Sequence, residues 1–203
     1  EITIEQLLQN RGGFSENSAP KNHNLLSLRN LSGSEKDQRY TYATLFMKEP
    51  LQQKPGKGFI YSNAGYTIAG AIAEKVTGKT YQELLHEKIF KPLNIASAGY
   101  GAMGESGKIS QPYQHNIVNG KPFPIEPSQM ADNPPVLTPA GRLHLSLEDW
   151  AKFIMIHLDS KTQKLLKPET LSRMQAPPRM NEYAMGWIVV ERQWADGSAL
   201  THA

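Results

Sequence analysis

Apolar residues recur at helical spacing in several parts of the chain, and each stretch is bounded by residues that begin or end helices. The clearest helix is expected at about 64–76, where Asn63 is a favourable N-cap and Gly78 a favourable terminator. A second helix should follow at once, because Thr80 begins a capping box, and Pro92 should end it. Shorter helices are expected at 3–8, 40–47, 146–158 and from Pro168.

The pattern changes near residue 183. Residues 183–191 are rich in β-forming side chains, Asp196-Gly197 is a turn signal, and residues 199–202 suit a returning strand. The stretches 15–58 and 96–141 are otherwise expected to be mostly loop. Helices first and an antiparallel hairpin last indicate an α+β fold. Because one hairpin is a marginal sheet, we expect its other strands to lie outside these 203 residues.

Composition narrows the function classes. A net charge of +3, with acids and bases interleaved, gives no basic patch, so we expect no nucleic-acid partner. The chain has no cysteine, which excludes disulfides, cysteine nucleophiles and thiolate metal sites. Its six histidines lack the spacing of a zinc site, and no apolar run reaches the roughly 20 residues of a membrane-spanning helix. We therefore expect neither a metal nor a transmembrane segment.

The candidate chemistry lies in Tyr61-Ser62-Asn63, immediately before the clearest helix. A phenol can move a proton, and an amide two residues away can donate and accept hydrogen bonds. Such a pair suits a site that handles an amide or ester carbonyl. Taken alone, Tyr61 is more typical of an ordinary buried tyrosine at the start of a helix, so the case for a site depends on the neighbouring motifs.

Those motifs occur in a characteristic order. The chain resembles the serine β-lactamase/penicillin-binding superfamily of class C type, which includes class C β-lactamases, D-Ala-D-Ala carboxypeptidases and related esterases. The resemblance rests on six matching segments spread over nearly the whole chain: Ile2–Leu8 with Gly12-Gly13-Phe14, Tyr61-Ser62-Asn63, Gly65-Tyr66 with Leu93-Asn94, Pro139–Leu143 with Asp149–Phe153, Met185-Gly186-Trp187, and Thr201-His202-Ala203. Each motif is weak alone, but the ordered set is specific.

The resemblance implies an acyl-enzyme mechanism without metal or organic cofactor. A Ser-x-x-Lys serine, which in the family precedes the first of these motifs and is absent here, would attack the carbonyl. Tyr61 would be catalytic and relay the proton, which a phenol with an ordinary pKa of about 10 can do only beside a cation. Asn63 and His202 would bind substrate, and the strand at 201–203 would help to bind the oxyanion. His202 stands where class C β-lactamases usually have lysine, which favours a peptidase or esterase.

By the same resemblance, residues 1–182 form a helical lobe and residues 183–203 begin the sheet of one catalytic domain. The implied partners are a β-lactam, a D-Ala-D-Ala peptide or an ester, and the implied location is periplasmic or secreted. Both ends of the chain look cut, and the 203 residues alone are expected to be inactive because the Ser-x-x-Lys serine is absent from them. Two alternatives stay open: a noncatalytic binding or structural relative, and a helical interaction domain without a site.

One internal Ser-x-x-Lys occurs at Ser18–Lys21. The chemistry needs serine and lysine one helical turn apart, and Pro20 would disrupt that turn. We interpret this match as chance. The glycine-rich stretch 101–108 lacks the spacing of a phosphate-binding loop and is interpreted as a surface loop.

Overall fold

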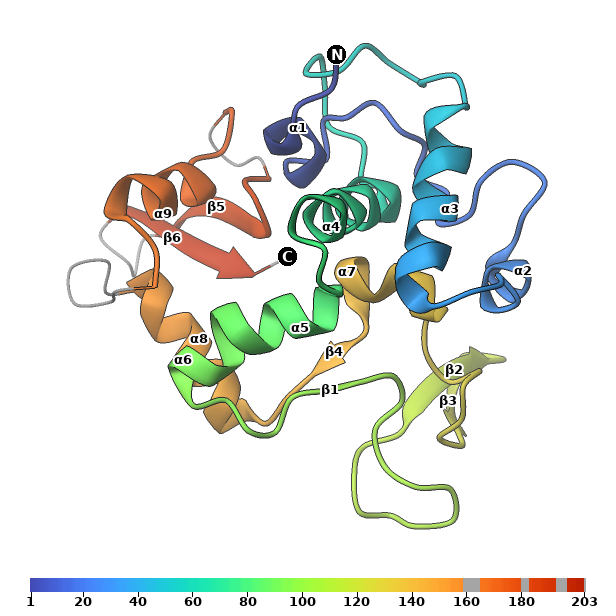
Figure 1. Cartoon of the computed structure of the whole chain (residues 1–203). Coiled ribbons are helices and arrows are strands. Elements are labelled where there is room, and N and C mark those ends of the chain that lie inside the picture. The colour runs from blue at the N-terminus through green and yellow to red at the C-terminus, as the bar shows by residue number, and fades with distance from the viewer. Residues whose placement is uncertain (159–164, 180–182, 193–196, 203) are drawn as a thin grey trace.

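The computed structural model describes residues 1–158, 165–179, 183–192 and 197–202. A central helix, α4 (Asn63–Thr77), organises the first part of the fold (Figure 1). The helices α1 (Ile4–Leu8), α3 (Glu35–Met47) and α7 (Thr138–Gly141) all pack against it. Together with the antiparallel strand pairs described below, this arrangement confirms the expected α+β fold.

Two glycines let α4 approach its neighbours closely. A Cβ atom on Gly70 would lie 2.5 Å from Pro139 Cγ, and one on Gly65 would lie 2.9 Å from the carbonyl oxygen of Leu7. A larger residue at either position would push α7 or α1 away from the helix. The core formed around these contacts consists of Leu7, Phe14, Leu28, Tyr42, Phe46, Ala64, Ile68, Val136 and Leu137.

The capping residues show where the helix predictions succeed and fail. The capping box of Thr3 and Gln6 is present at α1. Gly78 ends α4 in the left-handed conformation, at φ 76°, as expected. The prediction that Asn63 is the N-cap was wrong, because Ser62 holds the cap position and Asn63 is the first helical residue. This frees the Asn63 amide for another contact.

Two helices in the region expected to be loop begin with capping boxes of their own. Asn24 caps α2 (Leu25–Arg29), and Ser34 caps α3, which starts five residues before the predicted 40–47. The extra turn of α3 carries few apolar side chains, because its buried position is taken by Arg39. A search for apolar periodicity therefore misses this turn.

The helix that begins after Thr80 does not end at Pro92. It runs as α5 (Tyr81–Leu85), a π-helical turn η1 (His86–Phe90) and α6 (Lys91–Leu93), and it ends at Asn94 with φ 52°. Pro92 lies in the first turn of α6, directly after the wider π turn, where its missing N–H is tolerated. The expectation that Pro92 terminates the helix was wrong for this reason.

A β-hairpin interrupts the stretch predicted as loop between residues 96 and 141. Strand β2 (Gln114–Val118) pairs with β3 (Lys121–Ile125), and the two central turn residues, Asn119 and Gly120, have φ values of 50° and 74°. These angles are typical of a type I′ turn, which Asn-Gly favours. The dipeptide was thus the sequence signal for this hairpin. Nearby, β1 (Gly99–Tyr100) pairs with β4 (Leu143–His144), and the 3-10 turn η2 (Pro135–Leu137) leads into α7.

The C-terminal part consists of α8 (Leu147–Leu158), α9 (Pro168–Gln175) and the hairpin β5 (Trp187–Arg192) with β6 (Gly197–His202) (Figure 1). The hairpin is antiparallel as predicted, and its register pairs Trp187 with His202. Its first strand begins at Trp187 instead of 183, and Tyr183 makes only an isolated bridge to Ile188. Of the predicted turn Asp196-Gly197, Asp196 lies outside the described residues and Gly197 is the first residue of β6. The division between 1–182 and 183–203 stays a prediction.

A buried ion pair joins α3 to α4. The side chains of Arg39 and Glu74 are 0% and 1% exposed, and Arg39 donates from Nε to Oε2 at 3.0 Å and from Nη2 to Oε1 at 2.7 Å. Oε1 also accepts the backbone N–H of Tyr81 at 2.8 Å, at the start of α5. This two-bond geometry satisfies both charges where water cannot.

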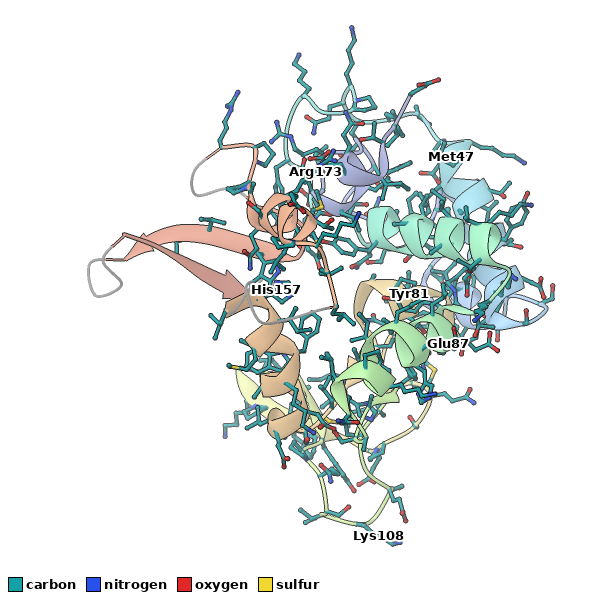
Figure 2. All side chains as sticks on the ribbon, turned by 60° about the vertical axis from the view of Figure 1, so that its left-hand side comes forward. Met47, Tyr81, Glu87, Lys108, His157 and Arg173 are labelled. Carbon is teal, nitrogen blue, oxygen red and sulfur yellow. The ribbon has the colours of Figure 1, made fainter. Side chains whose placement is uncertain are left out.

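A buried histidine links α8 to the C-terminal hairpin. His157 is 6% exposed, and its ring lies 5.0 Å from that of Phe153 and 4.5 Å from that of Trp187, centre to centre. The Gln175 amide lies 3.3 Å from Nδ1 and donates to the His157 carbonyl at 3.0 Å. Figure 2 shows His157 beneath α9 and beside the hairpin. Burial lowers the pKa of His157, because the ring is harder to charge away from water.

Removing one member of the buried ion pair should be costly. We expect Glu74→Ala to lower the free energy of unfolding by about 3–5 kcal/mol, because the buried Arg39 loses its two-bond partner and keeps only the partly exposed carboxylate of Glu35. The double variant Arg39→Met/Glu74→Leu should recover most of the loss. Urea unfolding measures both. The control is Glu87→Ala, which removes the exposed Lys79–Glu87 pair and should leave the free energy of unfolding unchanged. If Glu74→Ala also left it unchanged, the buried pair would not be a major source of stability.

The buried histidine predicts a pH dependence. Since the folded-state pKa of His157 is below its unfolded value of about 6.5, the unfolded chain binds the proton more readily, and stability falls as pH drops through about 6.5. We expect the melting temperature to fall more between pH 8 and pH 5.5 in the unmodified protein than in His157→Phe. The exposed His86 offers the control His86→Gln, whose curve should follow the unmodified protein. If the melting temperature fell equally with pH in all three proteins, His157 would not be the source of the pH dependence.

Candidate active site

The segment that contains Tyr61 alternates between exposed and buried side chains. Tyr61 is 51% exposed, whereas the next residue, Ser62, is 3% exposed and Asn63 is half-buried. Ser62 has extended backbone angles, and α4 begins directly after it. The chain therefore presents the phenol outward on a backbone whose following residue is fixed in the interior. Tyr61 directly precedes the N-cap of α4 and Asn63 is its first residue, so both belong to the N-terminal end of this helix.

A single residue at the end of α1 holds the backbone on both sides of Tyr61. The carbonyl oxygen of Asn10 accepts the N–H of Ile60 at 2.8 Å, and its side-chain Oδ1 accepts the N–H of Ser62 at 3.0 Å. Asn10 is 2% exposed and has φ 54°. No sequence motif predicted a role for this residue. Its only signal was an asparagine just past a short helix, where the left-handed conformation is common.

The Asn63 amide binds Ser18, the serine of the internal Ser-x-x-Lys match. Asn63 Nδ2 donates to Ser18 Oγ at 2.8 Å, and the backbone carbonyl of Ser18 accepts the Tyr42 hydroxyl at 3.0 Å. Residues 18–21 form bends and a turn, so Ser18 and Lys21 are not one helical turn apart. This geometry fits the interpretation of the Ser-x-x-Lys match as chance. Ser18 nevertheless restrains one of the predicted substrate-binding groups.

Two further tyrosines meet at the same end of α4: Tyr66, in the first turn of the helix, and Tyr183. The Tyr66 hydroxyl donates to the carbonyl of Leu8 at 2.8 Å and lies 3.1 Å from the Tyr183 hydroxyl. Burial, and then the neighbouring Tyr183, raises the pKa of Tyr66 far above its ordinary value. Burial also raises the pKa of Tyr183. Both phenols therefore stay protonated at neutral pH and serve as fixed hydrogen-bonding groups.

The C-terminal hairpin begins near these tyrosines. A Cβ atom on Gly186 would lie 4.0 Å from the Tyr66 hydroxyl oxygen, and the following residue, Trp187, pairs with His202 across the hairpin. The backbone of His202 is thus placed on the strand that approaches the N-terminal end of α4. The His202 side chain and residue 203 lie outside what the structure describes. The role of His202 in binding substrate stays a prediction.

A separate hollow of about 470 Å³ lies between α3 and α4 and includes neither Tyr61 nor Asn63. Its lining is largely apolar and includes Met47, Ile68 and Ile72. In the described part of the chain, no group of three or more acidic or histidine side chains has the arrangement of a metal site, and no helix is long and apolar enough to cross a membrane.

Comparison with known proteins agrees with this architecture. The sequence model of the family described as Beta-lactamase matches residues 1–203. The protein flp of Staphylococcus aureus is 27% identical over 201 residues, which cover 92% of this chain and 36% of flp. A D-stereospecific amidohydrolase from Streptomyces superposes with a TM-score of 0.69 at 21% identity, covering 99% of this chain and 60% of the enzyme. The D-amino acid amidase of Ochrobactrum anthropi SV3, solved with L-phenylalanine, gives 0.67 at 20% identity, covering 98% and 55%.

The chain therefore belongs to the beta-lactamase family, as the resemblance predicted. The two solved neighbours are named as an amidohydrolase and an amidase. The chain spans about a third of the length of flp and between half and two thirds of the two solved enzymes. Activity, substrate and partners of the whole protein are therefore proposals.

The contact between Ser18 and Asn63 can be tested without any substrate. Ser18→Ala removes the acceptor of the Asn63 amide, and we expect faster hydrogen exchange of that side-chain amide and a loss of about 1 kcal/mol in unfolding free energy. Ser106→Ala, which removes an exposed bond to Glu126, is the matched control and should leave the Asn63 amide unchanged. An Asn63 amide with equal exchange in both variants would exclude the contact. NMR of the side-chain amides measures this hydrogen exchange.

Proposed function

We propose that this chain is part of a serine hydrolase that cleaves an amide, lactam or ester through an acyl-enzyme. Tyr61 would transfer the proton, Asn63 would bind the acyl side of the substrate, and His202 would line the opposite wall. The attacking serine would come from a Ser-x-x-Lys segment outside these 203 residues. Neither a metal nor an organic cofactor takes part in the proposed reaction.

The observation that carries this proposal is the exposed phenol of Tyr61 on a restrained backbone. Ser62, directly after it, is buried, and both flanking N–H groups are bound by Asn10. A tyrosine needed only for packing would be expected to bury its ring, as Tyr42 does at 0% exposure. A fixed, accessible phenol beside a half-buried amide matches what acid–base work on a carbonyl substrate requires.

The names of the two solved neighbours support an amide as the first substrate to test. One is an amidohydrolase and the other an amidase, and both names specify D-configured substrates. A peptide or amino-acid amide of D configuration is therefore the proposed substrate class, with esters and β-lactams as probes of the same acyl-enzyme. Cell-wall peptides contain such residues, so we propose a periplasmic or secreted location.

The test is covalent labelling of the full product of the gene that encodes this chain. We expect a fluorophosphonate and a penicillin each to add one adduct, visible by intact-mass analysis. Tyr61→Phe should slow the penicillin reaction roughly 100-fold or more, because general acid–base groups contribute that much. Tyr40→Phe is the matched control, since Tyr40 is similarly exposed at 57% but lies on α3, and its rate should be unchanged.

Three outcomes would count against the proposal. No adduct on the full gene product would favour the noncatalytic relative. An adduct on the isolated chain of 22.6 kDa would place the nucleophile within these residues, with Ser18 the first to examine. An unchanged rate in Tyr61→Phe would remove Tyr61 from the mechanism.

A further inference from the structure

The environment of Asn10 differs from that of the other asparagines with positive φ. Among the described residues, four asparagines have this conformation: Asn10, Asn22, Asn94 and Asn119. Asn22 and Asn119 are exposed, and Asn119 serves only to turn a hairpin. Asn10 is 2% exposed and lies in the interior between α1 and the segment before α4. A buried polar side chain in a left-handed conformation is retained only where its hydrogen bonds offset the cost of burial and strain.

The two bonds that Asn10 accepts from Ile60 and Ser62 have different chemical origins. The bond to the Ile60 N–H uses the backbone carbonyl of Asn10, and any residue with the same φ and ψ could make it. The bond to the Ser62 N–H uses the side-chain oxygen, so it depends on the residue type. Tyr61 lies between the two anchored peptide groups. Its Cα position is thereby restrained from both sides by one residue.

The anchoring continues along both segments. The backbone N–H of Gly56 donates to the Arg11 carbonyl at 2.8 Å, and that of Gln52 donates to the Gly13 carbonyl at 2.9 Å. Residues 10–13 therefore run beside residues 52–62 with repeated backbone bonds. Only at Asn10 does the described pairing use a side chain to bind a main-chain N–H next to Tyr61. The side-chain oxygen of Asn10 thus restrains the peptide that joins Tyr61 to Ser62, immediately before α4 begins.

We propose that Asn10 is a positioning residue, whose side-chain oxygen fixes the direction of the Tyr61 phenol through the peptide of Ser62. This inference rests on the proposed function for its catalytic consequence. Asn10 touches neither substrate nor reacting atoms in this role. Loss of its oxygen lets the 61–62 peptide rotate, and small displacements of a catalytic group are known to reduce rates strongly.

The decisive variant is Asn10→Gly in the full product of the gene. Glycine tolerates the positive φ and keeps the carbonyl that binds Ile60, so the variant removes only the side-chain contacts of Asn10, with the Ser62 N–H and with the Tyr183 hydroxyl. We expect acylation to slow by roughly 10- to 100-fold with KM changed by less than about threefold, since the change affects a transition-state group. Asn10→Asp retains the acceptor oxygen and should restore most of the rate. Asn119→Gly removes an exposed left-handed asparagine and should have no effect.

Two readouts separate this inference from the proposed function. Hydrogen exchange at Ser62 should accelerate in Asn10→Gly, and the ring of Tyr61, assigned by comparison with Tyr61→Phe, should gain mobility in carbon relaxation measurements. Faster Ser62 exchange with unchanged acylation and an unchanged ring would overturn the positioning role. If the unmodified protein forms no adduct, the proposed function fails. In that case the mobility of the Tyr61 ring is the remaining test of the positioning role. Equal ring mobility in the unmodified protein and in Asn10→Gly would refute that role.

Discussion

The buried pair of Arg39 and Glu74 is the constraint on which the arrangement of helices depends. Glu74 binds Arg39 of α3 and the first N–H of α5, while Arg39 also reaches Glu35 and the Gln82 side chain. The helices α3 and α5 are thereby held at the C-terminal end of α4 by one buried carboxylate. Apolar packing would allow these helices to slide, whereas a two-bond ion pair defines one register.

The opposite end of α4 is restrained by hydrogen bonds of another kind. There the groups are neutral: the amides of Asn10 and Asn63, the hydroxyls of Ser18 and Tyr66, and main-chain atoms. Such bonds are individually worth about 1 kcal/mol, so this end is set by several modest contacts. The helix is thus fixed in place at its C-terminal end and finely oriented at its N-terminal end, where the candidate site lies.

The sequence predicted those features that depend on local chemistry. The capping box at Thr3, the left-handed Gly78 and the C-terminal hairpin follow from residue type and short-range spacing, and all are present. The first turn of α3 was missed because a buried arginine replaces the expected apolar side chain. The contacts of Asn10 with Ile60 and of Ser18 with Asn63 join residues about 45 or more positions apart, and no local pattern encodes such pairings. Tyr61 and Asn63 could be named from a motif, but the groups that hold them could not.

The hairpin of β2 and β3 has a consequence for how the chain meets other chains. Its two-residue turn makes Val118 and Lys121 a hydrogen-bonded pair, so alternation leaves Pro122 and Pro124 at positions whose N–H would point away from β2. Proline has no N–H, and the outer side of β3 therefore offers carbonyl oxygens without the donors between them. An extended strand from another molecule cannot continue the sheet on that side. The hairpin is exposed and carries several apolar side chains, and its β3 edge is in this way protected against edge-to-edge aggregation.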